Sequence, residues 1–281
     1  MVQRLTGTRI EIIRAVSTPV DIRVAVLDFD GTLSLIRGGW QSVMVSMMVE
    51  ELAALGTGES HDALWAEVSA FVDRLTGEPT ILQMEAFCRA LERRGARCES
   101  AEHYKERYLA RLSRTTHSRL TALEAETVRA DELMVPGARS LLERLVRDDI
   151  VCYLASGTDH EQVVEEASGL GIAHYFAGGI YGARPEPHGF SKGRLMKDLA
   201  RDHGLKDHQL AAFGDGPVEI RECARLGGIA IGVATHEAER GTWDVRKHEQ
   251  LTAAGAHVLV PDLAEHAALM DYLCAGCVRR E

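Results

Sequence analysis

Two carboxylates, one residue apart, end an apolar run near the start of the chain. Residues 24–33 read Val-Ala-Val-Leu-Asp-Phe-Asp-Gly-Thr-Leu, so Asp28 and Asp30 are followed at once by glycine. Because side chains at i and i+2 of a strand point to the same face, the two acids would lie side by side. Asp28 could attack phosphorus or hold a metal, and Asp30 could transfer protons. The pattern therefore indicates phosphoryl transfer; the alternative is a simple turn at the end of a strand.

Three further sites carry side chains that suit the same chemistry. Ser156 ends an apolar run and precedes Gly-Thr, Lys192 follows Gly-Phe-Ser, and the segment Gly-Asp-Gly-Pro-Val-Glu contains Asp215 and Glu219. A hydroxyl and an ammonium group can hold the oxygens of a transferring phosphoryl group, and carboxylates are the ligands that Mg²⁺ prefers.

Each of these residues also has a purely structural interpretation. Ser156 could be a loop serine or a helix cap, and Asp215 could belong to a turn. Lys192 could be a solvated lysine with Lys197 as its rival, but Lys197 falls in mid-helix and Lys192 at a helix start. Glu219 could be a first-turn glutamate favoured by the helix dipole. The functional interpretation depends on the four sites meeting in one place.

An α/β fold would bring the four sites together. Apolar runs typical of strands alternate with helical patterns, and these runs cover residues 22–29, 150–155, 209–213, 229–234 and 256–260. The first of these helical patterns has Pro136 in its first turn and carries Leu141, Leu142, Leu145 and Val146. The alternation predicts a Rossmann-like, mostly parallel sheet. In open parallel sheets ligands bind beyond the carboxyl ends of the strands, where all four sites would lie.

Residues 40 to about 130 show helical periodicity throughout. The clearest apolar stripe has the i, i+1, i+4, i+7, i+8, i+11 spacing of one helix face and consists of Leu64, Trp65, Val68, Phe71, Val72 and Leu75. The sequence therefore predicts an all-helical domain over 36–131, inserted into an α/β domain formed by 1–35 and 132–281.

Composition narrows the possible partners. The chain has 281 residues, a formal net charge of -10 and 46% hydrophobic residues. The negative charge argues against a general nucleic-acid or anionic-membrane binder. No apolar run approaches the roughly 20 residues of a membrane span, and the first residues contain no apolar signal region. We therefore expect a cytoplasmic protein.

The six cysteines give little functional signal. Cys152 and Cys223 lie in apolar patterns and are expected to be small buried residues. Cys274 and Cys277 form a single C-x-x-C without the second pair that a zinc site needs. We interpret that pair as incidental thiols of a reducing cytoplasm, with a redox or metal role as the alternative.

The four sites, in this order and spacing, resemble the motifs of the haloacid dehalogenase-like (HAD) superfamily. The similarity covers about residues 1–35 and 132–265. It implies Asp28 as nucleophile, Asp30 as general acid/base, and Ser156 and Lys192 as groups that hold the phosphate, together with Thr32 and Gly157. It also implies Mg²⁺ bound by Asp28, the backbone carbonyl of Asp30, Asp215 and Glu219. Glu219 departs from the pattern, because this position is more usually Asp, so direct and water-mediated metal binding both stay open.

The helical segment resembles a C1-type cap, as in phosphoglycolate phosphatase and phosphoserine phosphatase relatives. Such caps close over small soluble substrates and carry specificity. Arg37 and Trp40 follow the first motif where the two domains would meet. Arg37 could clamp a second anionic or sugar group or be a solvated hinge residue, and Trp40 could contact substrate or belong to the cap core. Phosphonate-hydrolysing relatives use a cap lysine, but Lys105, the only lysine between residues 33 and 191, is expected on an exposed helix.

The resemblance implies an Mg²⁺-dependent phosphatase that hydrolyses the phosphate monoester of a small metabolite through an aspartyl-phosphate. A sugar phosphate or a short phosphorylated acid is the expected substrate, and a monomer or homodimer the expected state. A phosphomutase with the same nucleophile is one alternative. A non-catalytic metabolite-binding domain is another, although the intact acids speak against it.

Overall fold

The structure is a computed structural model, and it describes residues 3–16, 19–184 and 190–274. One eight-stranded sheet has the order β1-β2-β8-β7-β6-β3-β4-β5, in which β3 to β8 run parallel and β1 and β2 are antiparallel at one edge. Its strands are β1 (Gln3–Arg4), β2 (Glu11–Ile12), β3 (Val24–Leu27), β4 (Val151–Asp159), β5 (Gly179–Ala183), β6 (Leu210–Gly214), β7 (Ile229–Val233) and β8 (Val258–Val260). The α/β fold predicted from the sequence is confirmed.

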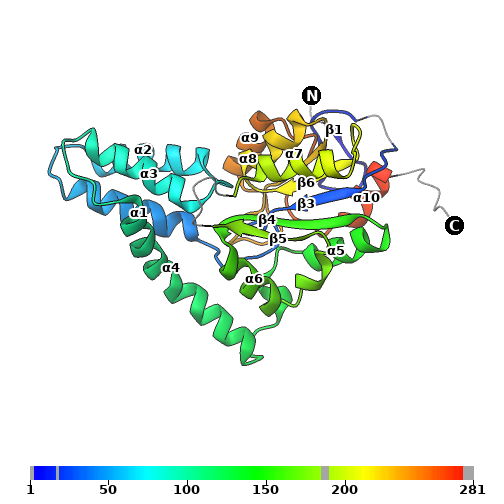
Figure 1. Ribbon diagram of the computed structural model, residues 1–281, viewed down its shortest axis with the longest axis horizontal. Helices are drawn as coiled ribbons and strands as arrows, with labels where there is room; N and C mark the ends of the chain where they lie inside the picture. Colours follow the sequence, from blue (N-terminus) through cyan, green and yellow to red (C-terminus); the bar gives the residue numbers. More distant parts are fainter. Residues whose placement is uncertain (1–2, 17–18, 185–189, 275–281) are drawn as a thin grey trace.

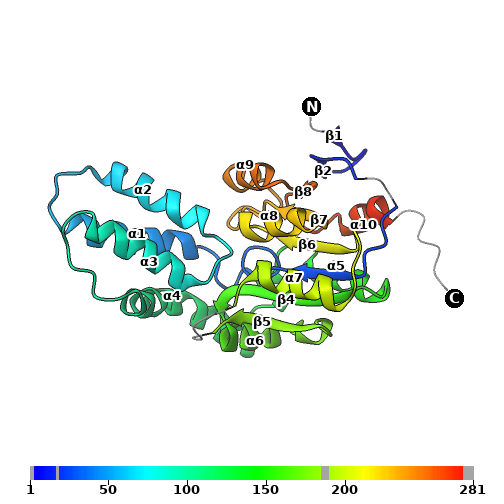
Figure 2. The same cartoon turned by 45° about the horizontal axis from the view of Figure 1, so that its top comes forward.

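Helices cover both faces of this sheet (Figures 1 and 2). One face packs against α5 (Ala138–Arg147), α6 (His160–Gly169) and α10 (His266–Cys274). The other face packs against α7 (Lys192–Asp202), α8 (Pro217–Arg225) and α9 (Val245–Ala254). The central strand β3 is therefore buried on both faces, with Val24 and Val26 in one cluster and Ala25 and Leu27 in the other. This double burial explains why its sequence is a continuous apolar run rather than an alternating one.

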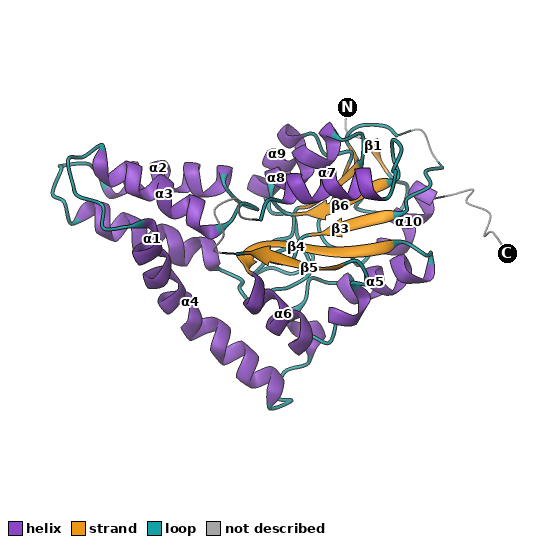
Figure 3. Cartoon of the chain, in the orientation of Figure 1, coloured by secondary structure: helices purple, strands orange, loops and turns teal. Residues whose placement is uncertain are grey.

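Four helices form an insert beyond the carboxyl end of β3, and the last of them runs back beside α6 (Figures 1 and 3). They are α1 (Trp40–Ala53), α2 (His61–Arg74), α3 (Thr80–Glu92) and α4 (Ala101–Glu124), and we call them the helical insert. The insert has its own buried cluster, which includes the predicted stripe residues Leu64, Val68, Phe71 and Val72. The chain returns to the sheet through the short 3-10 helix η1 (Ala130–Leu133).

A disulfide joins Cys88 in α3 to Cys98 in the connection to α4. Sequence analysis missed this bond, because a spacing of ten residues carries no pairing signal of its own. Proteins of reducing compartments rarely keep such bonds, and the cytoplasmic location stays a prediction. Cys152 and Cys223 are buried as expected, while Cys277 lies outside the described residues.

Several local predictions need correction. The strands β1, β2 and β5 were missed, since β1 and β2 have two residues each and β5 contains two glycines. Val146 does not share the buried face of α5 but is 46% exposed. Pro136 precedes α5 instead of lying in its first turn, because the helix begins after Gly137. Among the described residues, no helix is long and apolar enough to cross a membrane.

We expect Leu141→Ala to lower the free energy of unfolding by about 2–5 kcal/mol, because Leu141 is fully buried and its truncation leaves a cavity between α5 and the sheet. Urea unfolding followed by circular dichroism measures this change. Val146→Ala on the same helix is the control and should change stability by less than about 0.5 kcal/mol. Equal losses in both variants would contradict the assigned faces of α5.

Candidate active site

The predicted site residues meet at the carboxyl edge of the sheet. Asp28 and Asp30 follow β3, Ser156 lies in β4, and Asp215 follows β6. Because β3 pairs in parallel with both β4 and β6, these three strand ends are neighbours. Lys192 begins α7 and Glu219 lies in the first turn of α8, so both helices direct a charged side chain toward the same edge.

Lys192 lies between two carboxylates in the interior. Its Nζ donates to Asp28 Oδ1 at 2.6 Å and to Glu219 Oε2 at 3.0 Å. Glu219 Oε1 accepts from the Gly216 N–H at 2.8 Å, which fixes the glutamate at the start of its own helix. Lys192, Asp28 and Glu219 are all buried, whereas the rival Lys197 is exposed. The choice of Lys192 from its place at a helix start is therefore consistent with the structure.

Burial and charge together perturb this cluster. Burial raises the pKa of Asp28 well above its ordinary range; Lys192 opposes the shift, while Glu219 and Asp215 add to it. Burial acts against the Lys192 ammonium, yet Asp28 and Glu219 raise the pKa of Lys192 above its ordinary value. The lysine is therefore charged at neutral pH and compensates part of the negative charge that the acids bring into the interior.

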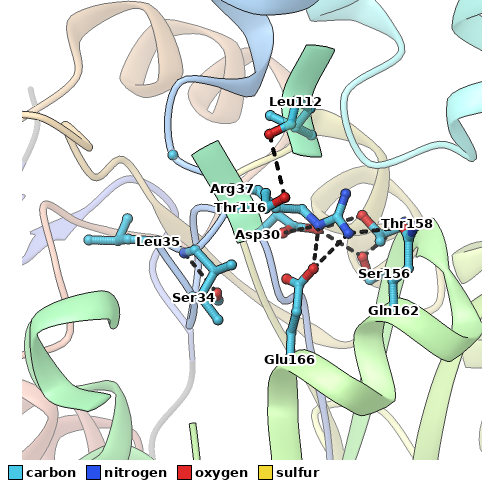
Figure 4. A network of polar contacts seen from close by, with 12 residues as sticks. Asp30, Ser34, Leu35, Arg37, Leu112, Thr116, Ser156, Thr158, Gln162 and Glu166 are labelled. Carbon is cyan, nitrogen blue, oxygen red and sulfur yellow. Dashed lines mark hydrogen bonds and ion pairs between the residues drawn. The ribbon is translucent and has the colours of Figure 1, made fainter. Parts of the chain in front are cut away.

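Asp30 is held by two hydroxyl groups of β4 (Figure 4). Ser156 Oγ donates to Asp30 Oδ2 at 3.1 Å and Thr158 Oγ1 donates to the same oxygen at 2.8 Å. The other oxygen, Oδ1, accepts no hydrogen bond from the described residues. Burial raises the pKa of Asp30, with Arg37, Thr158 and Ser156 opposing the shift. A carboxyl group with a raised pKa and one uncommitted oxygen suits proton transfer.

Arg37 reaches from the start of the insert into the core (Figure 4). Its Nε and Nη2 donate to Glu166 Oε1 at 2.9 and 2.6 Å, and Nη2 also donates to Gln162 Oε1 at 2.9 Å. Its Nε lies 3.8 Å from Asp30 Oδ1. Arg37 is buried and therefore not a solvated hinge residue. The structure connects it to Asp30 and to α6, and a specificity role stays a prediction.

Three carboxylates form a group that could hold a metal ion. Asp28, Asp215 and Glu219 each offer an oxygen, and these atoms lie within 4.8 Å of one another. All three are buried, and oxygen ligands of this kind fit Mg²⁺. The donor set thus agrees with the predicted metal residues, although Glu219 already contacts Lys192. The Asp30 carbonyl, the fourth predicted ligand, belongs to the same strand end.

A pocket lies between the sheet edge and the helical insert. Asp28, Asp30, Ser156, Gly157 and Asp215 line it from the core. The insert contributes polar and aromatic side chains, namely Trp40, Thr76, Glu78, Thr80, Gln83, Lys105 and Tyr108. Trp40 lines the pocket and also packs against the core of the insert; its contact with substrate stays a prediction.

The structure does not place every predicted residue on the pocket wall. Thr32 is fully buried and does not line the pocket, so its predicted phosphate contact has no support from the geometry. Lys192 and Glu219 do not line the pocket either and reach it only through their contacts with Asp28 and with each other. Lys105 is not an exposed helix residue as expected: it lines the pocket, and its Nζ donates to Asp159 Oδ1 of the core at 2.6 Å. Thr158 and Glu166 were missed, although Thr158 follows Ser156 by two residues and therefore shares its strand face.

The family model for haloacid dehalogenase-like hydrolases matches residues 22–227. The chain belongs to the haloacid dehalogenase-like hydrolases. No curated protein matches this sequence. The resemblance seen in the four motifs is thus confirmed at the level of the family.

Solved structures of the HAD-like fold resemble the chain at low sequence identity. A hydrolase from Pseudomonas syringae is 17% identical, with a TM-score of 0.58, over 89% of this chain and 98% of that one. A predicted phosphoglycolate phosphatase from Haemophilus somnus 129pt is 14% identical, with a TM-score of 0.56 and the same coverage. A beta-phosphoglucomutase from Clostridium difficile is 15% identical, with a TM-score of 0.56, also over 89% and 98%. At such identities these likenesses show the fold alone.

We expect Glu166 to make stability depend on pH. Burial raises the pKa of Glu166 to about 7, with Arg37 opposing the shift. The folded state then keeps a proton that the unfolded state releases at lower pH, so stability falls as pH rises from the ordinary value of 4.5 toward 7. Glu166→Gln cannot ionise and should lose less stability across this window in urea unfolding. Glu161→Gln, at an exposed position of the same helix, is the control; parallel curves for Glu166→Gln and wild type would contradict the assignment.

Proposed function

We propose that this chain is an Mg²⁺-dependent phosphatase that hydrolyses the phosphate monoester of a small metabolite through a phospho-Asp28 intermediate. The observation that carries the proposal is the juxtaposition of two differently held carboxylates at one pocket. Asp28 is held by the Lys192 ammonium at 2.6 Å, and Asp30 by the hydroxyls of Ser156 and Thr158. Burial raises the pKa of both acids, but the Lys192 ammonium favours the anionic form of Asp28, whereas Asp30 accepts hydrogen bonds from two neutral hydroxyls. This difference in partners suits a nucleophile and a general acid.

In the first half-reaction, a carboxylate oxygen of Asp28 attacks phosphorus and the bond from phosphorus to the ester oxygen breaks. Asp30 gives its proton to that leaving oxygen, so the metabolite departs as an alcohol. Lys192 and Ser156 stabilise the charge on the phosphoryl oxygens, where positioning and electrostatics supply most of the rate.

In the second half-reaction, Asp30 is a carboxylate and takes a proton from water as the water oxygen attacks phosphorus. The bond between phosphorus and the Asp28 oxygen breaks, which releases phosphate and restores both acids. Asp28, Asp215, Glu219 and the Asp30 carbonyl would hold Mg²⁺, whose charge offsets the repulsion between the nucleophile and the phosphate.

The helical insert supports a small substrate. Its residues form one wall of the pocket, and Lys105 joins that wall to Asp159 of the core. A cap in this position leaves little access for a folded protein. The polar wall fits a sugar phosphate or a short phosphorylated acid, and the negative net charge of -10 argues against nucleic acid. A cytoplasmic monomer or homodimer completes the proposal.

A phosphomutase is the second candidate, because a similar solved structure is a beta-phosphoglucomutase. The same nucleophile would then return its phosphoryl group to a second hydroxyl of a bound sugar instead of to water. Release of free phosphate distinguishes a phosphatase from a mutase, which forms an isomeric sugar phosphate.

We expect Asp28→Asn to abolish phosphate release while the fold is retained, since the amide cannot form the phospho-enzyme. A panel of small phosphate esters, assayed with Mg²⁺ and after exhaustive EDTA treatment, measures the effect. The exposed Asp62→Asn is the matched control and should keep wild-type turnover. Turnover that survives in Asp28→Asn would refute the nucleophile, and turnover that survives EDTA would refute the metal.

We expect Asp30→Asn to reduce kcat by about 10²–10⁴-fold, because the amide can neither protonate the leaving oxygen nor activate water. Acid quenching after mixing with substrate should reveal more phosphorylated protein than in wild type if the second step is slowed most. A change confined to KM would contradict the acid/base assignment.

A further inference from the structure

A second buried lysine contacts the other side of the acidic cluster. Lys247 Nζ lies 2.8 Å from Asp215 Oδ2 and 3.0 Å from Glu237 Oε1. The lysine lies in the first turn of α9 and is buried, whereas Glu237 lies in the loop between β7 and α9. None of the four motifs includes either residue, and the phosphatase mechanism above does not use them.

The position of Lys247 is unfavourable by local rules. A cation in the first turn of a helix opposes the helix dipole, and burying an ammonium group is costly without partners. Burial acts against its charge, but Asp215 and Glu237 raise the pKa of Lys247 above its ordinary value. These two carboxylates therefore stabilise the charged form of Lys247 at a position where the helix dipole disfavours a cation.

The same contacts continue to the start of the helical insert. Glu237 Oε2 accepts from the Gly39 N–H at 3.0 Å, and Gly39 immediately precedes α1. Gly31 packs against this group so closely that a Cβ there would lie 2.1 Å from Asp215 Oδ2 and 3.2 Å from Glu237 Oε1. An unbroken series of polar contacts thus joins Gly39, Glu237, Lys247 and Asp215.

Glu237 and Lys247 have different effects on Asp215. The ammonium group fixes one oxygen of Asp215, which orients the other. Glu237 supplies a competing negative charge, so Lys247 is shared between two acids and does not neutralise Asp215 alone. Groups that orient the ligands of a metal in this way typically change metal affinity about 10- to 100-fold when they are replaced.

We propose that Glu237 and Lys247 form a positioning relay that holds Asp215 in its metal-binding orientation and links it to the start of the helical insert through Gly39. The relay rests on the proposed function, because it presumes that Asp215 binds Mg²⁺. If Mg²⁺ binding is coupled to the contact between Glu237 and the Gly39 N–H, then Mg²⁺ should in turn protect the Gly39 segment from opening.

Calorimetric titration with MgCl₂ in the absence of substrate tests the metal end. Glu237→Gln should weaken Mg²⁺ binding about 10- to 100-fold, since Lys247 then pairs with Asp215 alone. Glu239→Gln removes the same charge from an exposed position on the same loop and should bind Mg²⁺ as wild type does. An affinity for Glu237→Gln equal to that of Glu239→Gln overturns the proposal.

A double-mutant cycle shows whether Glu237 acts through the lysine. In a Lys247→Gln background, the further change Glu237→Gln should leave Mg²⁺ affinity within about twofold, because the relay is already broken. An equal loss of Mg²⁺ affinity in both backgrounds would show that Glu237 acts independently of Lys247 and would overturn the relay. Asp215→Asn separates the two proposals: if it leaves Mg²⁺ affinity unchanged, the metal site of the proposed function fails first. Circular dichroism melts identify any variant that does not fold.

Hydrogen exchange tests the other end of the relay. Mg²⁺ should slow amide exchange at residues 36–43 of the wild type and of Glu239→Gln, and should not do so in Glu237→Gln. Equal protection in all three proteins would remove the link to the helical insert from the proposal, even where the calorimetric result supports the metal end.

Discussion

The buried ammonium of Lys192, held between Asp28 and Glu219, is the interaction on which the rest of the site depends. Three charged groups in the interior are costly unless each finds a partner of opposite sign at hydrogen-bond distance. That requirement brings the end of β3 and the starts of α7 and α8 together. Lys192 lies 164 residues from Asp28 and 27 residues from Glu219 along the chain. The sheet supplies this convergence, because parallel strands end at the same edge.

The two aspartates of the first motif differ in the groups that surround them. Asp28 faces a lysine ammonium, whereas Asp30 faces two hydroxyls and, at 3.8 Å, Arg37. Arg37 in turn is bound to Glu166 of α6. Asp30, the proposed general acid, is therefore connected through Arg37 to α6, a helix that covers one face of the sheet.

The helical insert is tied to the core at several points around the pocket. Arg119 of α4 donates to the carbonyls of Leu35, Ile36 and Gly38 at 3.2, 2.7 and 3.0 Å, which fixes the segment that leads into α1. Lys105 contacts Asp159, and Arg246 of α9 contacts Asp73 of α2. These contacts hold the insert over the carboxyl edge of the sheet, where it completes the pocket that the motifs alone leave open.

The sequence by itself determined the α/β fold, the helical insert and the positions of Asp28, Asp30, Ser156, Lys192, Asp215 and Glu219, because each follows an apolar run or begins a helix and local spacing records this. Only the tertiary structure decided which charged side chains contact one another around the site. Glu166 lies 129 residues from Arg37, and the Lys105 contact with Asp159 spans 54 residues. Lys247 and Glu237 belong to none of the four motifs. Only folding brings them to Asp215, since pairing of buried charges depends on proximity in space and leaves no periodic trace along the chain.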